Sequence, residues 1–348
     1  MSLLEVRDLR VSFDTPDGVV RAVRGVSFDV ERGRTLGVVG ESGSGKSVTA
    51  QTLLRLTPGA RVSGAARFEG RDLLRMPAEE LRRIRGARIA MIFQDPLSSL
   101  HPLYRVGRQI AEMIRAHRPD TPAARARARA VELLGLVGIP EPDRRAEDYP
   151  HQFSGGMRQR AMIAMALALE PALIIADEPT TALDSTVRAQ ILDLLLRLQR
   201  EFGTALVMIT HDLGVVAELA DEVLVMYAGK PAEHAGRRDL FHRHHHPYTK
   251  GLLESVPRAG RGRARLRPVA GQPPSLIDVP PACPFHPRCP YVMDRCRVDE
   301  PPPRPVPSPG GREHRSACWL PLEAQGRDAG AERLRERAVA EGRTREAG

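Results

Sequence analysis

A glycine-rich loop near the N-terminus constrains the fold of this chain more than any other segment does. Residues 40–47 read GESGSGKS, with the apolar run 35–39 before them and the run 48–54 after them. A loop of this spacing between a strand and a helix binds phosphate through backbone N–H groups and the helix N-terminus. We expect Lys46 to reach the β- and γ-phosphates and Ser47 to ligate Mg²⁺. The loop residues expected to bind the nucleotide are Gly40, Ser42, Gly43, Ser44, Gly45, Lys46, Ser47 and Val48.

Two adjacent carboxylates follow a second apolar strand. Residues 173–176 read LIIA and lead directly into Asp177 and Glu178. Ligands of open α/β sheets bind at the carboxyl ends of parallel strands, so both side chains are predicted to face the nucleotide. Phosphoryl transfer depends mainly on positioning and charge neutralisation. We therefore expect Asp177 to hold Mg²⁺ through water and Glu178 to orient and polarise the attacking water.

Two further segments complete a set that occurs once in the chain: Gln94 after the apolar run 89–93, and FSGGMRQR at residues 153–160. With them, the sequence from about residue 4 to residue 319 resembles the ATP-binding subunits of ABC transporters. The resemblance implies an α/β fold, with a P-loop NTPase (RecA-like) core, an ABC-type β-subdomain and an inserted helical subdomain. It also implies that Ser154, Gly155 and Gly156 of one subunit cap the γ-phosphate held by another. A single set of segments then supplies half of a dimer.

The resemblance assigns roles to four more residues. His211, after the predicted strand 206–210, resembles the switch histidine that contacts the γ-phosphate, although a lone histidine at a strand end is more often structural. Gln94 resembles the glutamine that touches Mg²⁺ and relays the nucleotide state to the membrane subunits. Residues 182–184, ending in Asp184, resemble the loop that crosses the dimer interface. Phe13 is our choice for the ring that stacks on adenine, and a core position suits it equally well.

Composition limits the environment of the chain. The 348 residues carry a formal net charge of +9 and are 42% hydrophobic, yet no apolar run approaches the ~20 residues of a membrane-spanning helix. The N-terminus lacks a cleavable signal pattern, so we expect a cytoplasmic protein. Only 4% of residues are aromatic and the arginines are scattered over predicted surface helices, which argues against nucleic acid as a partner. An arginine-rich surface facing anionic lipid is the expected explanation of the charge.

Alternating strand and helix patterns run over residues 1–250, which we assign to the ATP-binding domain, with the helical subdomain at about 96–170. Apolar residues at 187, 191, 194, 195 and 198 predict an amphipathic helix that packs on the sheet. The resemblance places the contact with a membrane partner at residues 95–102. Residues 323–348 are polar and lack apolar periodicity, which predicts a mobile tail.

Residues 251–322 are rich in proline and arginine and hold all four cysteines. The motifs PYTKGLLESVP, GQPPSL and ACPFHPRCP resemble the C-terminal extension of the oligopeptide and dipeptide importer ATPases. In a reducing cytosol, clustered thiols in a segment with little core favour a metal over disulfides. Their spacing lacks the close pairs of structural zinc sites and favours a [4Fe–4S] cluster, with zinc and no metal as the alternatives. The expected ligands are Cys283, Cys289, Cys296 and Cys318.

Other residues near these cysteines receive no ligand role. His286 lies between the first two cysteines and is expected to be a loop residue. Residues 242–245, which read HRHH, are expected to form a solvated loop. We expect the cysteine site to act structurally, because it is far in sequence from every ATP-binding residue.

These features predict an ATPase subunit of a binding-protein-dependent importer of oligopeptides or dipeptides, at the cytoplasmic face of the inner (plasma) membrane. Its expected partners are a homologous second ATPase subunit, two membrane permeases and an extracytoplasmic solute-binding protein. A nickel or other small-solute importer of the same subfamily is one alternative. A soluble ABC ATPase acting on the ribosome or DNA is a second alternative, disfavoured because the chain lacks tandem cassettes and long coiled-coil insertions.

Overall fold

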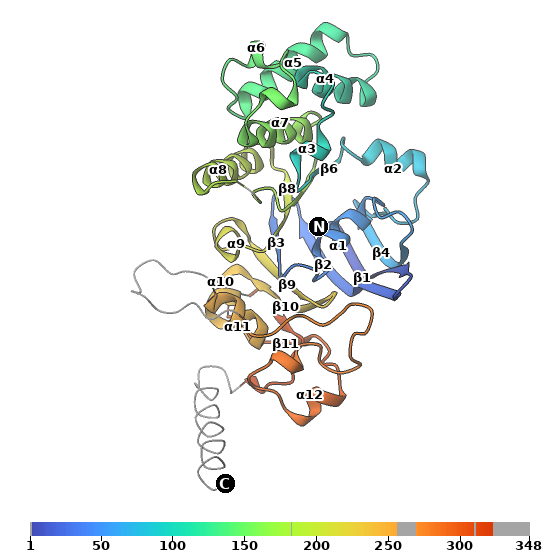
Figure 1. Cartoon of the computed structure of the whole chain (residues 1–348), viewed down its shortest axis with the longest axis vertical. Coiled ribbons are helices and arrows are strands. Elements are labelled where there is room, and N and C mark those ends of the chain that lie inside the picture. The colour runs from blue at the N-terminus through green and yellow to red at the C-terminus, as the bar shows by residue number, and fades with distance from the viewer. Residues whose placement is uncertain (1, 182, 256–268, 310, 323–348) are drawn as a thin grey trace.

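An eight-stranded sheet runs through the centre of the computed structural model, which describes residues 2–181, 183–255, 269–309 and 311–322 (Figure 1). Ala182 and the predicted tail at 323–348 lie outside the described residues. The strand order is β11-β12-β10-β9-β3-β8-β7-β6. The five strands from β9 to β6 are parallel, whereas β10, β12 and β11 continue the sheet with antiparallel pairing. The strands are β3 (Thr35–Val39), β6 (Ile89–Ile92), β7 (Leu173–Asp177), β8 (Ala205–Thr210), β9 (Glu222–Tyr227), β10 (Lys230–Gly236), β11 (Arg304–Pro305) and β12 (Arg315–Ser316).

A second, antiparallel sheet has the order β2-β1-β4-β5. Its strands are β1 (Ser2–Thr15), β2 (Gly18–Glu31), β4 (Arg61–Phe68) and β5 (Arg71–Asp72). β1 and β2 form a hairpin in which Thr15 pairs with Gly18. Apolar side chains of this sheet share one core with β3, β7 and β8 and with α1 (Lys46–Leu53). That core fixes the antiparallel sheet beside the strand that leads into the phosphate loop.

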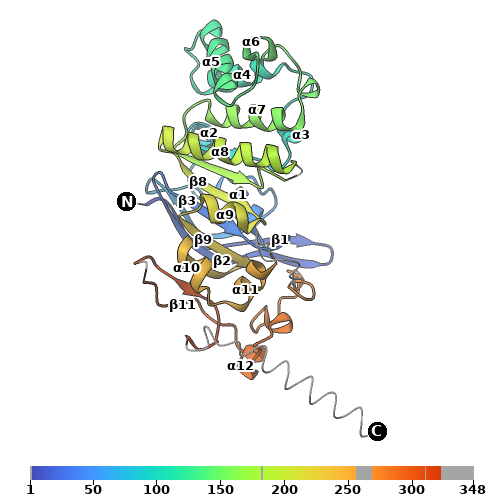
Figure 2. The same ribbon diagram turned by 90° about the vertical axis from the view of Figure 1, so that its left-hand side faces the viewer.

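The remaining helices are arranged around the two sheets. A helical layer lies at one end of the molecule, around a core that it shares with β6, β7 and β8 (Figures 1 and 2). The helices are α2 (Ala78–Ile84), α3 (Pro96–Ser99), α4 (Val106–His117), α5 (Ala123–Leu136), α6 (Pro142–Arg145), α7 (Gly155–Leu167), α8 (Ser185–Phe202), α9 (Leu213–Leu219), α10 (Arg237–Arg243), α11 (Pro247–Glu254) and α12 (Asp294–Val298), with short 3-10 turns η1 (Pro150–Gln152) and η2 (His286–Arg288). In the described part of the chain, no helix is both long and apolar enough to cross a bilayer.

Helix α8 confirms the amphipathic pattern found in the sequence. Ile191, Leu194, Leu195 and Leu198 are buried, and Val187 packs against the same core. Apolar residues spaced by three and four positions lie on one face of a helix, so this face covers the sheet. The helix begins after Asp184, whose carboxylate accepts hydrogen bonds from two backbone N–H groups of the first turn.

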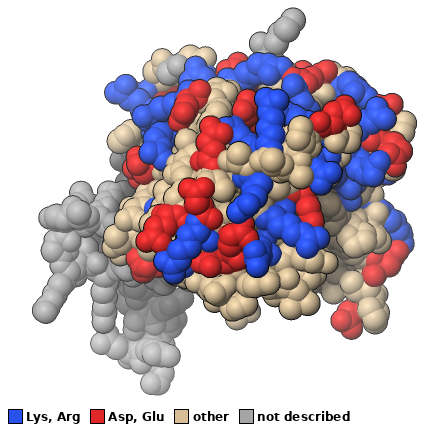
Figure 3. Space-filling view, turned by 90° about the horizontal axis from the view of Figure 1, so that it is seen from above, with Lys and Arg blue, Asp and Glu red and all other residues tan. Residues whose placement is uncertain are grey.

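Charge at the helical end of the molecule is mixed. Figure 3 looks onto this end and shows Lys and Arg side chains interspersed with Asp and Glu side chains. Ion pairs join Arg108 to Glu112 and Arg144 to Glu141, within α4 and at α6. Paired surface charges of this kind give little net attraction to a polyanion.

The C-terminal extension packs on the far edge of the central sheet. β12 pairs with β10, and the buried side chains of Cys283, Phe285 and Cys296 share a core with Tyr227 of β9 and Tyr248 of α11. Phe285 lies 5.3 Å from Tyr227 and 5.4 Å from Tyr248 between ring centroids. The extension therefore continues the core of the sheet.

The histidine-rich segment at 242–245 is solvated only at its start, where His242 and Arg243 end α10 and are exposed, and the expectation of a solvated loop was wrong for His245. His245 is 5% exposed, and its ring bonds Ser316 Oγ at 3.0 Å and the Leu320 carbonyl at 2.9 Å. Its backbone N–H donates to Glu233, a carboxylate 1% exposed that also bonds His314 Nε2 at 2.7 Å. Burial alone would raise the pKa of Glu233, but the hydrogen bond from His314 helps to hold it below its usual range. The segment thus ties β10 to the extension.

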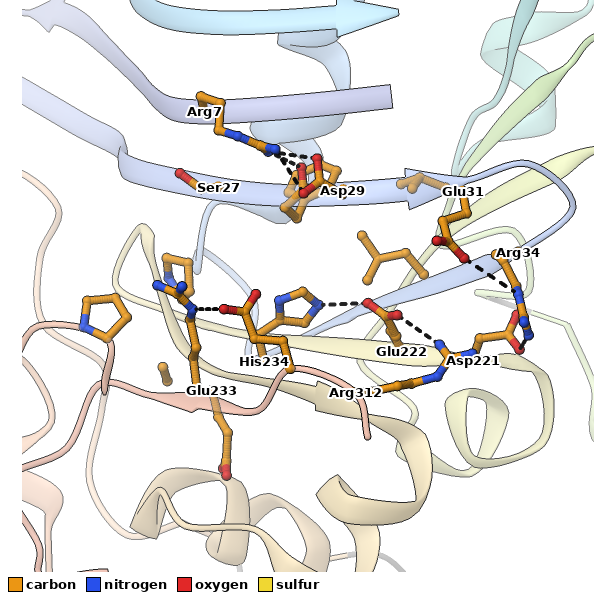
Figure 4. Close-up of a pocket in the computed structure, with 18 of the residues that line it drawn as sticks. Arg7, Ser27, Asp29, Glu31, Arg34, Asp221, Glu222, Glu233, His234 and Arg312 are labelled. Carbon is orange, nitrogen blue, oxygen red and sulfur yellow. Dashed lines mark hydrogen bonds and ion pairs between the residues drawn. The ribbon is translucent and has the colours of Figure 1, made fainter. Parts of the chain in front are cut away.

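A cavity of about 620 Å³ lies where the two sheets meet the extension (Figure 4). Its charged side chains face one another in pairs. Arg7 lies 2.7 Å from Asp29, and Arg312 lies 2.8 Å from Glu222. Because these charges pair with one another, we interpret the cavity as a space between packed layers and not as a ligand site.

Candidate nucleotide site

Lys46 is buried inside the glycine-rich loop between β3 and α1. It is 4% exposed, and its Nζ donates to the carbonyl oxygens of Gly40 and Glu41, both at 2.8 Å. Burial lowers the pKa of Lys46, while the carboxylates of Glu178 and Asp177 act in the opposite direction. Gly45 precedes the helix at φ +97°, and a side chain there would clash with the Ala22 carbonyl oxygen. Only glycine fits that position.

The side chains of Ser47 and Asp177 bring together two oxygen atoms that can ligate a metal ion. Ser47 Oγ donates to Asp177 Oδ1 at 2.8 Å, joining the first turn of α1 to the end of β7. Asp177 is 3% exposed, and burial raises its pKa although the bond from Ser47 opposes the shift. Hydroxyl and carboxylate oxygens are the ligands that Mg²⁺ prefers, so this pair fits the expected metal role.

Glu178 and His211 meet at the carboxyl ends of two neighbouring strands. Glu178 Oε2 lies 3.2 Å from His211 Nδ1 and accepts a hydrogen bond from Thr181 Oγ1 at 2.9 Å. The Glu178 backbone has φ +48°, a left-handed conformation that is uncommon for a non-glycine residue and frequent at functional sites. Its N–H donates to the Ile209 carbonyl at 2.9 Å, which holds the residue against β8.

The five residues Lys46, Ser47, Asp177, Glu178 and His211, which are predicted to act on the phosphates, are therefore brought together. They come from α1, β7 and the end of β8, three elements that adjoin in the fold. The glutamate side chain is 15% exposed and the histidine side chain 61% exposed, so the site opens toward solvent on the histidine side. A phosphate bound at the loop would contact the buried Lys46. A water molecule that attacks this phosphate would contact the Glu178 carboxylate.

Ser154, Gly155 and Gly156 begin helix α7. Ser154 is the N-cap, and its Oγ accepts a hydrogen bond from Met157 N at 3.3 Å. A Cβ on Gly156 would approach Val187 Cγ1 to 2.8 Å, so the turn packs closely on the start of α8. In both views α7 lies away from α1 along the long axis (Figures 1 and 2). The structure thus does not bring these residues to the phosphate loop of the same chain.

For three further predicted residues the structure shows surroundings but no contact that defines a role in the site. Gln94 follows β6 and is exposed, and Asp184 caps α8. Phe13 is half-buried on β1, opposite Val20 of β2, and packs against the same core as Val48. Phe13 therefore packs against the core, which was one of the two roles expected for it. Its stacking on adenine stays a prediction.

Sequence reasoning missed a wall of the site that the extension supplies. A pocket of about 290 Å³ is lined by loop residues 41–44 and by the segment Pro273–Ile277. The Leu276 carbonyl accepts a hydrogen bond from Arg21 N at 2.9 Å, which fixes this segment beside β2. The GQPPSL motif was visible in the sequence, but nothing in it indicates which surface it covers.

The four cysteines are free and line one small pocket. Cys283, Cys289, Cys296 and Cys318 come together there with aromatic neighbours, including Phe285 and Trp319. Burial raises the pKa of Cys283 to about 11 and those of Cys289 and Cys318 to about 12. Among the described residues, no group of three or more His, Cys, Asp or Glu side chains is arranged to hold a metal ion. The four thiols thus line one pocket, but the described residues are not arranged as a metal-binding site.

Comparison with known proteins gives a consistent result. A family model described as ABC transporter matches residues 23–181, and one described as oligopeptide/dipeptide transporter, C-terminal region, matches residues 232–296. The chain is 52% identical over 322 residues to the oligopeptide transport ATP-binding protein OppD of Salmonella typhimurium, covering 92% of this chain and 94% of that protein. It is also 52% identical to the dipeptide transport ATP-binding protein DppD of Bacillus subtilis, covering 91% and 94%.

The solved structures that it resembles include a dimeric ATP-binding cassette, MJ0796, in a post-hydrolysis state bound to ADP and Pi. The TM-score is 0.61 at 28% identity, covering 68% of this chain and 99% of that chain. The expected fold class is confirmed, since loop, carboxylates and sheet define a P-loop ATPase of the cassette type. More narrowly, the chain belongs to the ATP-binding subunits of the oligopeptide/dipeptide ABC transporter family.

Proposed function

We propose that this chain binds and hydrolyses ATP to power import of oligopeptides or dipeptides. The observation that carries the proposal is the convergence of buried Lys46, the Ser47–Asp177 pair and the Glu178–His211 pair on one edge of the sheet. Bound Mg²⁺ would neutralise charge on the phosphates. Lys46 would bind the phosphate oxygens and Glu178 would orient water and accept its proton. His211 would hold the Glu178 carboxylate and sense the γ-phosphate.

The proposal includes a shared site between two ATPase subunits. In support, Ser154 begins a helix remote from the phosphate loop of its own chain, and a helix N-terminus favours an anion. Gln94 and Asp184 are exposed, as residues that contact another chain or its nucleotide would be. We further propose a homologous partner subunit, two permeases docked near residues 95–102, and an extracytoplasmic solute-binding protein. Such a complex holds the chain peripherally at the cytoplasmic face of the membrane.

This arrangement makes hydrolysis depend on the partner. The isolated chain is expected to hydrolyse ATP slowly, because its loop lacks the Ser-Gly-Gly turn of a second subunit. Adding the homologous subunit with the permeases should raise the rate, measured as phosphate release in reconstituted vesicles. Peptide uptake into the same vesicles tests the transport role. Full ATPase activity in a strictly monomeric preparation would contradict the shared site.

We also propose that the four cysteines ligate a [4Fe–4S] cluster. Support comes from their convergence on one pocket and from the donor set, since four thiolates suit such a cluster. Burial raises the pKa of Cys283, Cys289 and Cys318, so a bound metal would have to displace the protons of these thiols. The cluster would fasten together a segment with little apolar core of its own.

Metal analysis checks this second proposal. Protein purified without oxygen should contain about four irons per chain, and Cys289→Ser should lose most of that iron. Cysteine at position 289 contributes one of the four thiols of the pocket, so removing it breaks the ligand set. A finding of stoichiometric zinc without iron, or of neither metal, would refute the cluster.

A further inference from the structure

Glu41, the second residue of the phosphate loop, is bound by the C-terminal part of the chain. Its N–H donates to Tyr248 Oη at 2.9 Å, and its carbonyl accepts from Lys46 Nζ at 2.8 Å. Its carboxylate receives two parallel bonds from Arg288, Nη1 to Oε2 at 2.7 Å and Nη2 to Oε1 at 2.8 Å. Bidentate pairs of this kind combine strength with a defined orientation. The loop is therefore held by residues more than 200 positions away.

Arg288 is itself fixed in place. Its side chain is 4% exposed, and it also donates to the carbonyls of Ala270 at 2.8 Å and Val269 at 3.1 Å. Nη1 lies 3.3 Å from Tyr227 Oη, and the hydrogen bond to Glu41 helps to raise the pKa of Arg288. A planar guanidinium held on several acceptors stays charged and cannot turn away easily.

The ion pair removes an electrostatic conflict inside the loop. The glycine-rich loop attracts phosphate, whereas a free carboxylate at position 41 would repel it. Arg288 supplies the compensating charge at the Glu41 carboxylate, whereas Lys46 bonds the Glu41 backbone carbonyl. It lies on η2, between Cys283 and Cys289, where Arg288 N donates to the Phe285 carbonyl at 3.0 Å. Its position therefore depends on the folding of the four-cysteine segment.

We propose that Arg288 is a positioning residue for ATP, which neutralises Glu41 and so lets the four-cysteine segment set the affinity of the phosphate loop for nucleotide. The inference rests on the proposed ATP-binding role of that loop and adds a control exerted by the extension. This control requires no particular metal at the cysteines, because the contact between the segment and the loop is made by the side chains of Arg288 and Glu41.

Calorimetric titration of the full-length chain with MgATP tests the role. Arg288→Met should raise the Kd about ten-fold, because it leaves the Glu41 carboxylate uncompensated beside the bound phosphates. The double variant Arg288→Met with Glu41→Gln should return to within about two-fold of Glu41→Gln alone, since the unpaired charge is gone. Arg297→Met, at an exposed position of α12 in the same segment, should leave the Kd unchanged.

A purely structural role gives a different pattern. If Arg288 only docked the extension, the double variant would bind MgATP as weakly as Arg288→Met, and that result would overturn the inference. An unchanged Kd for Arg288→Met would do the same. Cys289→Ser should raise the Kd in the native background and far less in the Glu41→Gln background. Failure of the unaltered chain to bind MgATP would instead reject the proposed function.

Discussion

Replacing Glu178 with glutamine is expected to lower ATP hydrolysis about 10²–10⁴-fold while ATP binding stays near that of the unaltered protein. Glutamine keeps the shape of the side chain and can still bond His211 and Thr181, the two groups within 3.2 Å of Oε2. It cannot accept a proton from water. Because binding and closure continue without hydrolysis, the variant should accumulate as an ATP-bound dimer with its partner subunit.

Phosphate release and size-exclusion chromatography with ATP measure the two effects. Glu201→Gln removes an exposed carboxylate from the last turn of α8 and serves as the matched control. Hydrolysis by the Glu178→Gln complex at the normal rate, with the partner site inactivated, would remove Glu178 from its proposed role.

Replacing Lys46 with methionine is expected to weaken ATP binding itself, by about 100-fold or more. Methionine has a similar length, so the change removes mainly the charge. Hydrogen bonds to charged groups contribute ~1.5–3 kcal/mol each, and Lys46 would make at least one such bond to phosphate. The loss also leaves the Gly40 and Glu41 carbonyls without the ammonium group that they now bond at 2.8 Å.

The two variants distinguish the two halves of the site. Lys46→Met should fail at binding, measured by titration with MgATP, whereas Glu178→Gln should fail only at hydrolysis. Thermal unfolding without nucleotide shows whether the loop variant is still folded. A folded Lys46→Met protein that binds MgATP normally would contradict the role of Lys46.

Local signals in the sequence were sufficient for the core of the site. The apolar runs before the glycine-rich loop and before Asp177 each predict a strand that ends at the site, and both strands are found. Parallel strands bring their carboxyl ends to one edge, so residues 130 positions apart, Ser47 and Asp177, could be expected to meet. These inferences need only short-range patterns and one rule of topology.

The contacts of the C-terminal extension could not be obtained in this way. Residues 269–322 form few regular elements, so no periodicity indicates which face they cover. Distance along the chain led us to expect only a structural role for the cysteine segment, and it gave no indication that Arg288, inside that segment, binds Glu41 of the phosphate loop. The burial of His245 was missed for a related reason. A polar run such as HRHH indicates solvent unless its buried acceptor, Glu233, is known to lie beside it.

The pairing of β12 with β10 means that a sequence-based domain boundary near residue 250 is not a place to cut the protein. Truncation there would expose the edge of β10 and remove His314, the partner of a carboxylate that is 1% exposed. Leaving a buried hydrogen-bonding group without its partner costs about 1–3 kcal/mol, and more for a carboxylate, which is a large part of the stability of a typical domain. We therefore expect the cassette and its extension to unfold together, and a cassette shortened at residue 250 to be a poor substitute for the whole chain in crystallisation or binding studies.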